Sequence, residues 1–451
     1  MTTIAANPLV VAPILPTLVR LSLPNMVAMV ATARVAIAET TYVGRLGTPA
    51  LAGMALVFPM VMLQQMMSAG AMGGGISSAV SRALGAGDEA RAGSLALHAA
   101  VIGTVAGLVF TVFFLLLGTE IYRLLGGQGE ALSQALAFSN VVFLGAPAIW
   151  LTNTFASVIR GGGNMKVPSA TLLSVAVLQM ILGGCLGLGL GPFPRWGMAG
   201  VALGQVLAYG VGMLFFLWLL VSGRTRVRLS FRGVPLRSAM FADILRVGAL
   251  ACVSPLQTVL TILILTRLVA FFGTEALAGY GIGARLEFLL IPITFAIGVA
   301  CVPMVGMAIG AGRVHRARRV AWTGGILSGL LIGAAGLFVA AFPDLWAAFF
   351  TEDPAVRASA RSYLVWSGPG YGFFGLGLCL YFAAQGAGKM LGPVLAGTVR
   401  LVVIAIGGWW LAATDAPQWT MFALVGGAMV IYGVAMALAV YWTSWTPRPR
   451  A

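Results

Sequence analysis

The chain has 451 residues, of which 60% are hydrophobic and only 9% are charged, whereas soluble domains carry roughly 25% charged residues. This composition excludes an ordinary soluble enzyme and indicates an integral membrane protein. The formal net charge of +15 does not indicate a nucleic-acid partner, because Lys and Arg are concentrated in every second loop.

Apolar stretches of about 20 residues, the length that a helix needs to cross a bilayer, follow one another along the whole chain. They lie at residues 17–43, 53–80, 94–118, 132–159, 168–190, 198–222, 247–271, 278–309, 321–342, 358–384, 392–412 and 419–443. The sequence therefore predicts an all-α polytopic membrane protein with 12 transmembrane helices.

The most polar stretch runs from Ser222 to Arg246 and divides six predicted helices from six. We therefore expect an N-terminal lobe at residues 1–222, a cytoplasmic linker at residues 223–246 and a C-terminal lobe at residues 247–451.

Three motifs of the first half return in the second half at nearly one displacement. Residues 47–53 return as 273–279, 85–87 as 310–312, and 161–165 as 386–390. The displacements are 226, 225 and 225 positions, so a gap of a single residue aligns all three motifs. The two halves are therefore an internal repeat. An even number of helices in each repeat predicts a parallel repeat of two pseudo-symmetric six-helix lobes, an arrangement typical of transporters that alternate access by rocking.

Basic residues mark alternate loops as cytoplasmic by the positive-inside rule. The marked loops contain Arg82, Arg91, Arg160, Lys166, Arg224, Arg226, Arg228, Arg232, Arg237, Arg313, Arg316, Arg318 and Arg319. Arg448 and Arg450 place the C-terminus on the same side, and an even number of spans then places the N-terminus there too. The N-terminal residues show no removable signal peptide. We expect a multi-pass protein of the plasma (inner) membrane with both termini cytoplasmic.

Only two of the twelve acidic residues, Glu39 and Glu287, fall inside predicted spans. A charge in hydrocarbon is costly, so such a residue is a functional candidate. Glu39 is predicted to couple transport to an ion: its carboxyl group could take up a proton outside and release it inside, and Tyr42, one turn away, could hydrogen-bond it. An ion pair with Arg34 is the structural alternative. Glu287 could couple ions or simply pair with Arg285.

Two amide side chains inside predicted spans, Asn153 and Gln179, are further candidates for the substrate path, together with Arg34, Tyr42 and Glu287. The four cysteines lie singly in apolar spans, and His98 and His315 have no Cys or acidic ligands beside them. The sequence thus predicts no enzyme, no metal site and no cofactor.

Several segments resemble the multidrug and toxic compound extrusion (MATE) transporters over nearly the whole length. The segments that carry the resemblance are residues 42–47 followed by 50–52, and residues 81–87, 159–164, 285–287 and 309–312. The resemblance implies two six-helix lobes and export of cationic or amphipathic compounds against inward-flowing protons or sodium. It also implies a small-molecule substrate, a lipid environment and a monomer.

The residues of this chain modify what the resemblance implies. The family's first-helix acid falls on Glu39, and its fifth-helix Asn and Asp fall on Gln179 and Gly183, so one carboxylate is lost. The seventh-helix and tenth-helix acids of the sodium-linked branch have no counterpart. The sequence thus favours a proton gradient over sodium, and a zwitterionic or neutral amphiphile also remains open as substrate.

Two other functions remain open. A lipid or lipid-linked oligosaccharide flippase of the same wider superfamily would share the architecture but needs a basic site for phosphate. A non-transporting membrane enzyme or channel subunit would need catalytic residues or a pore motif, and the sequence shows neither.

Overall fold

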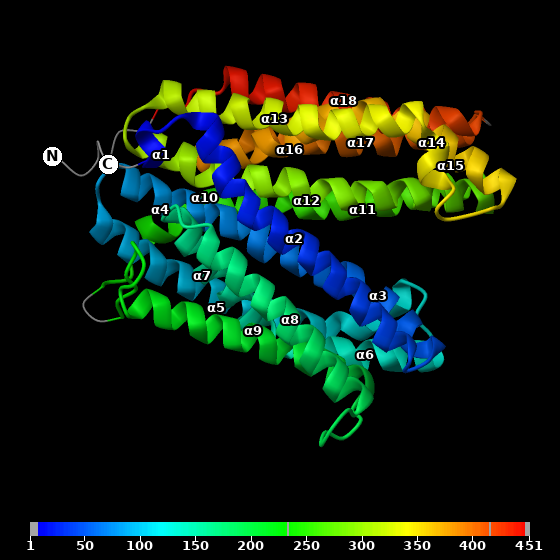
Figure 1. Ribbon diagram of the computed structural model, residues 1–451, viewed down its shortest axis with the longest axis horizontal. Coiled ribbons are helices and arrows are strands. Elements are labelled where there is room, and N and C mark those ends of the chain that lie inside the picture. Colours follow the sequence, from blue (N-terminus) through cyan, green and yellow to red (C-terminus); the bar gives the residue numbers. More distant parts are fainter. Residues whose placement is uncertain (1–7, 232–233, 415, 447–451) are drawn as a thin grey trace. The chain divides into compact units, whose positions relative to one another are not determined.

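The computed structural model describes residues 8–231, 234–414 and 416–446, apart from the side chains of residues 32–34 and 36 (Figure 1). Every regular element among these residues is a helix. A backbone in hydrocarbon has no water to bond, and a helix satisfies its N–H and C=O groups internally. The predicted all-α class is confirmed.

The chain packs into two compact units: residues 23–249, here called the N-terminal unit, and the residues up to Ser22 with residues 250–451, here called the C-terminal unit. The N-terminal unit differs from the lobe expected at residues 1–222, because residues 8–22 pack in the C-terminal unit and most of the linker packs here. Its elements are α2 (Ile14–Gly44, from residue 23), α3 (Thr48–Gln65), the π-helical turn η1 (Met66–Met72), α4 (Gly73–Gly85), α5 (Glu89–Leu124), α6 (Gly129–Leu144), α7 (Ala146–Gly161), α8 (Lys166–Leu188), α9 (Gly197–Val221) and α10 (Ser238–Ala251, to residue 249).

The C-terminal unit repeats this order of helices. After α1 (Pro8–Val11) and the first turns of α2 it contains α11 (Val253–Ala270), α12 (Thr274–Gly310), α13 (Val314–Ala341), α14 (Pro343–Ala347), α15 (Pro354–Ser367), the short 3₁₀ turn η2 (Gly368–Gly370), α16 (Tyr371–Gly386), α17 (Leu391–Ala413) and α18 (Gln418–Trp442). Figure 1 shows the long helices of each unit lying side by side with similar axis directions.

Among the described residues, ten continuous helical stretches are long and apolar enough to cross a membrane. The pair α6 and α7, bent by 50° at Gly145, could make an eleventh. The tenth predicted span corresponds to α15, η2 and α16, which follow one another from Pro354 to Gly386. This stretch is interrupted by Gly368 to Gly370, and α15 carries Arg357 and Arg361, so neither helix crosses alone by length and composition.

The internal repeat is visible in the backbone at each of the three recurring motifs. Glycines at positive φ occupy equivalent turns: Gly47 (116°) and Gly273 (104°), Gly87 (78°) and Gly312 (73°), and Gly163 (89°) and Gly388 (73°). A non-glycine residue rarely adopts such angles. The motifs recur because the same turn must be made in each half.

The helix contacts repeat as well. A Cβ atom on Gly53 would lie 2.8 Å from the backbone nitrogen of Ala135, and one on Gly279 would lie 2.6 Å from that of Ala360. Both pairs bring two helices into backbone contact at equivalent positions of the repeat. Small residues allow this approach in a membrane protein, where lipid offers no hydrophobic force to drive helices together.

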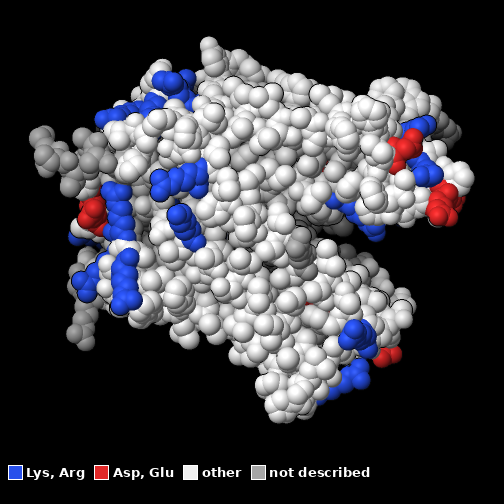
Figure 2. Space-filling view, viewed as in Figure 1, with Lys and Arg blue, Asp and Glu red and all other residues white. Residues whose placement is uncertain are grey.

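Charged residues gather near the helix ends in each unit, and the surface between them on the face that Figure 2 shows carries almost none. Large apolar side chains are exposed along the helices, as at Leu116 (73%) and Leu330 (68%). Apolar surface of this extent suits lipid rather than water. The chain is a multi-pass membrane protein.

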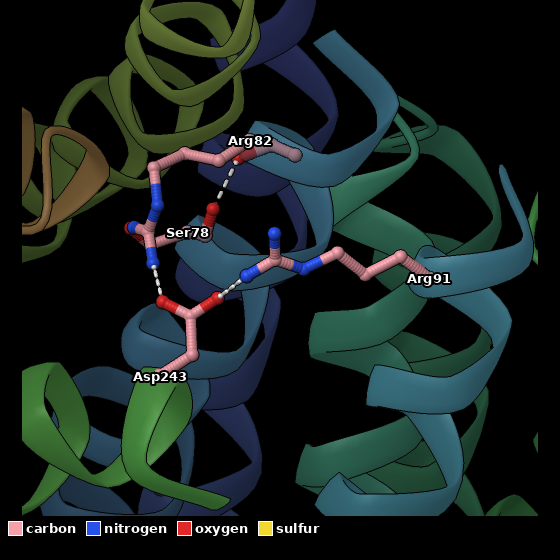
Figure 3. A network of polar contacts seen from close by, with 5 residues as sticks. Ser78, Arg82, Arg91 and Asp243 are labelled. Carbon is pink, nitrogen blue, oxygen red and sulfur yellow. Dashed lines mark hydrogen bonds and ion pairs between the residues drawn. The ribbon is translucent and has the colours of Figure 1, made fainter. Parts of the chain in front are cut away.

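Helix α10 is held in the N-terminal unit by a partly buried ion cluster (Figure 3). Asp243 of α10 accepts from Arg82 of α4 at 2.6 Å and from Arg91 of α5 at 2.8 Å, and Arg82 also donates to Ser78. The three charged side chains are between 17% and 35% exposed. A carboxylate shared by two guanidinium groups in such a position is stronger than an ordinary surface pair.

We expect Asp243→Asn to lower the free energy of unfolding by about 1–3 kcal/mol, because charge-assisted bonds to two arginines are lost. Glu120→Gln is the matched control: its pair with Arg123 is more than half exposed, so its loss costs at most about 1 kcal/mol. Thermal unfolding in a neutral detergent measures both variants, and equal melting temperatures for the two would contradict the assignment.

Candidate functional site

Glu39 lies on α2 in the N-terminal unit and is half-buried. Its Oε1 accepts a hydrogen bond from Nε2 of Gln179 on α8, so the structure brings together two of the predicted residues. Glu39 forms no salt bridge with a described basic side chain. The side chain of Arg34, its predicted alternative partner, lies outside the described residues.

Tyr42 is buried one turn further along α2 and lies close enough to Glu39 to interact with it electrostatically. Its hydroxyl oxygen occupies the space beside Gly183: a Cβ atom on Gly183 would lie 2.7 Å from it. An acidic side chain at residue 183 would therefore displace Tyr42. At residue 183, where the resemblance implies an acid, this chain has glycine, and the Tyr42 hydroxyl fills the space beside it.

Asn153 belongs to a second polar network in the same unit. The amide nitrogen of this buried residue on α7 donates to Oε1 of Gln65 at 3.0 Å and to the hydroxyl of Ser68 at 2.8 Å. Gln65 donates in turn to the Tyr209 hydroxyl of α9 at 2.5 Å. Ser68 lies in the π-helical turn η1, a distortion often found at functional sites.

Tyr209 connects the two networks electrostatically, because it lies within range of the Glu39 carboxylate as well as bonding Gln65. One ionisable carboxyl group is thus accompanied by amides and phenols from α2, α3, α7, α8 and α9. These neutral groups donate or accept hydrogen bonds without adding charge. Such a set can hold a proton at Glu39 or release it without leaving a second charge unpaired.

Glu287 lies in the C-terminal unit on α12 and is half-buried. Its Oε1 accepts from the Tyr363 hydroxyl of α15 and, at 3.4 Å, from the Tyr371 hydroxyl of α16. Arg400 of α17 lies within electrostatic range. The pairing with Arg285 proposed from sequence is not found: that guanidinium lies over the ring of Phe350, 5.0 Å from its centroid.

The predicted candidates therefore fall into separate groups. Glu39, Tyr42 and Gln179 lie together, Asn153 lies in the neighbouring network, and Glu287 lies in the other unit. Sequence reasoning missed the partners Gln65, Ser68, Tyr209, Tyr363 and Tyr371. The one available signal was the polar Gln64-Gln65 pair inside an apolar span. Among the described residues no group of three His, Cys, Asp or Glu side chains could hold a metal ion.

A family model described as MatE matches residues 24–184 and again residues 250–410. The chain belongs to the MatE family. The two matches to one MatE model begin 226 positions apart, which is the displacement of the first repeated motif. The internal repeat is therefore that of MatE proteins, and the resemblance noted from individual motifs is confirmed.

Known MatE relatives align along most of this chain. It is 24% identical over 401 residues to the FAD transporter of Shewanella oneidensis, covering 88% of this chain and 87% of that protein. It is 26% identical over 383 residues to the probable multidrug resistance protein NorM of Thermotoga maritima, covering 84% and 81%. These relatives are transporters, which fits a protein that is not an enzyme.

The fold is shared with solved MatE structures. A MOP superfamily transporter from Pyrococcus furiosus superposes with a TM-score of 0.87 over 98% of this chain and 97% of that chain, at 23% identity. The predicted architecture of two helical lobes is thereby confirmed for this MatE protein.

Asn153→Leu is expected to lower the free energy of unfolding by about 1–3 kcal/mol, since Gln65 and Ser68 lose a buried donor. Asn140→Leu makes the same change at an exposed position of α6 and should cost less than about 0.5 kcal/mol. Melting temperatures of both variants in one detergent provide the comparison. An Asn153 variant as stable as the Asn140 variant would show that the network does not bear on stability.

Proposed function

We propose that this MatE protein is a secondary active exporter of cationic or amphipathic small molecules, working by alternating access as a proton antiporter. Glu39 is the proposed ion-coupling residue. The observation that carries the proposal is its environment: a half-buried carboxyl group in a membrane helix, bonded to the neutral amide of Gln179 and without a described cationic partner.

The chemistry follows from that environment. An ionised Glu39 is held by Gln179 and attracts a cation, whereas a protonated Glu39 is neutral and does not. Exchange of a proton for a cationic substrate then leaves the net charge of the site balanced in both states. Sodium is less favoured, because a hard cation is best held by several oxygen ligands and only one carboxylate is present here.

The proposal extends to substrate and topology. Relatives named as multidrug resistance or multidrug export proteins support a broad range of small molecules. The basic residues of alternate loops support cytoplasmic termini in a plasma (inner) membrane. We propose that the protein works as a monomer.

Glu39→Gln should abolish substrate-linked proton release when a cationic dye is added to purified protein, because glutamine cannot exchange a proton. Glu130→Gln, at an exposed acid in the first turn of α6, is the matched control and should release protons as the native chain does. A pH indicator measures release, and dye polarisation measures binding separately. If both variants release protons equally, Glu39 is not the coupling residue, and Glu287 is the next candidate.

A second candidate, export of an organic anion, is supported by the C-terminal unit. Its membrane helices place Arg267 over Phe271 and Arg400 over Phe374, at 5.4 Å and 5.0 Å from the ring centroids. Neither arginine forms a salt bridge with a described acidic side chain. Guanidinium groups beside aromatic rings suit an aromatic anion such as a flavin nucleotide. The relative named as an FAD transporter supports this candidate.

If the substrate is an aromatic anion, Arg400→Gln should reduce its export about 10-fold to 100-fold, the value of one lost charge-assisted hydrogen bond. Arg361→Gln, which breaks an exposed pair with Asp344, is the control and should leave export intact. Parallel export assays with FAD and a cationic dye decide between the two candidate functions. If the Arg400 variant loses export of the dye alone, export of an aromatic anion is contradicted.

A further inference from the structure

The linker between α9 and α10 is packed against the N-terminal unit rather than free. Residues 223–231, here called the basic strap, turn back at Gly223 (φ 71°), and the N–H of Leu229 donates to the carbonyl of Leu220 at 3.0 Å. The strap passes so close to α5 that a Cβ atom on Gly93 would lie 2.9 Å from the Arg228 carbonyl oxygen. The strap is therefore a fixed part of the unit's surface.

Side chains alternate along the strap between the unit's interior and its surface. Val227 and Leu229 are each only 2% exposed, whereas Arg224, Arg226 and Arg228 are exposed. Two buried apolar anchors thus hold three guanidinium groups on the outer face. The sequence from residue 222 to residue 242 contains five arginines and no acidic residue, so this charge is not neutralised within the linker.

The strap begins where a lipid-facing surface ends. Helix α9 exposes one apolar stripe at helical spacing, made of Leu207, Val211, Leu214, Phe215, Trp218 and Val221. Trp218 is the last aromatic residue of this stripe, and tryptophan is enriched where a membrane meets water. The Arg224 guanidinium lies over the Trp218 ring, 4.6 Å from its centroid. The first arginine of the strap is thereby placed at the level of the headgroups.

Apolar side chains are also exposed on the far side of the arginines. Phe231 is 61% exposed and Leu236 is 59% exposed, although both belong to a polar linker. The far end of the linker is fixed as well, because the N–H of Arg237 donates to Nε2 of the buried His98 at 2.9 Å. Exposed apolar groups next to a row of cations are the combination that binds a charged membrane surface.

The nearest acidic side chain does not compete for this role. Glu89 lies 3.9 Å from Arg226, and both side chains are exposed, at 69% and 37%. An exposed pair at this distance is weak. Asp243, in the second turn of α10, is already bonded to Arg82 and Arg91. The three strap arginines therefore remain available for an external anion.

We propose that the basic strap binds the phosphate headgroups of anionic phospholipids in the adjacent leaflet, with Phe231 and Leu236 entering the interface beside them. The strap then fixes the depth of α9 in the membrane and holds the start of α10 at the surface. Each arginine near an anionic membrane surface strengthens binding about 5-fold. Three together correspond to a preference on the order of 100-fold for anionic over neutral lipid.

The test measures lipid binding to the full chain, purified in a neutral detergent, by native mass spectrometry with phosphatidylglycerol or phosphatidylcholine added. The triple variant R224Q/R226Q/R228Q should bind phosphatidylglycerol at least tenfold more weakly and phosphatidylcholine equally. The control R45Q/R123Q/R195Q removes the same charge at exposed positions elsewhere in the same unit, two in loops and one in the last turn of α5, and should keep the preference. Melting temperatures without lipid confirm that each variant is folded.

Two further measurements distinguish a lipid headgroup from free phosphate as the ligand, and ionic contacts from apolar ones. Inorganic phosphate should not displace phosphatidylglycerol, whereas added salt should weaken its binding. Phe231→Ser with Leu236→Ser should weaken binding without changing its salt dependence. Displacement by inorganic phosphate alone, or an equal loss of preference in both triple variants, would overturn the proposal. This assay involves no transport, so its failure would leave the proposed export function untouched.

Discussion

Each charge placed within or beside hydrocarbon has to be satisfied by the unit that carries it, and this constraint shapes the chemistry of the protein. Glu39 is met by an amide, Glu287 by two phenols, and Asp243 of α10 by two guanidinium groups. The hydrogen-bond partners of Glu39 and Glu287 are neutral, so they stabilise a carboxylate without adding a charge of their own. Asp243 has cationic partners, whose charge-assisted hydrogen bonds hold its side chain in place.

The internal repeat supplies a nearly symmetric scaffold on which the acids are not symmetric. The turns at Gly87 and Gly312 and the helix contacts at Gly53 and Gly279 are equivalent. In contrast, the positions equivalent to Glu39 and Glu287 in the other half hold apolar residues at either displacement: Ile264 or Leu265, and Val61 or Met62. Packing and turn requirements are shared by the two halves, whereas polar chemistry is specific to each. The two units therefore have different roles in the proposed transport cycle.

Hydropathy predicted the helices and the recurring motifs predicted the internal repeat, because both can be read directly from the sequence. The pair of Glu287 with Arg285, one of two possibilities left open from the sequence, is not found, because residues two apart on a helix point in different directions. The network of Asn153, Gln65, Ser68 and Tyr209 joins three segments distant in sequence: the consecutive α3 and η1, α7, and α9. No periodicity marks such contacts. The pairing of Glu39 with Gln179 was foreseen only as two positions of a family pattern.

The pair Tyr42 and Gly183 explains how one acid can be absent from this pattern without leaving a void. Gly183 leaves room for a phenol, and the Tyr42 hydroxyl occupies the space beside it while lying within electrostatic range of Glu39. Two neighbouring carboxylates repel each other and share protons, whereas one carboxylate beside a phenol changes charge in a single step. Under the proposed function the N-terminal unit thus exchanges one charge in each cycle. A substrate with a single positive charge matches this step, and a dication would require a second acid elsewhere in the chain.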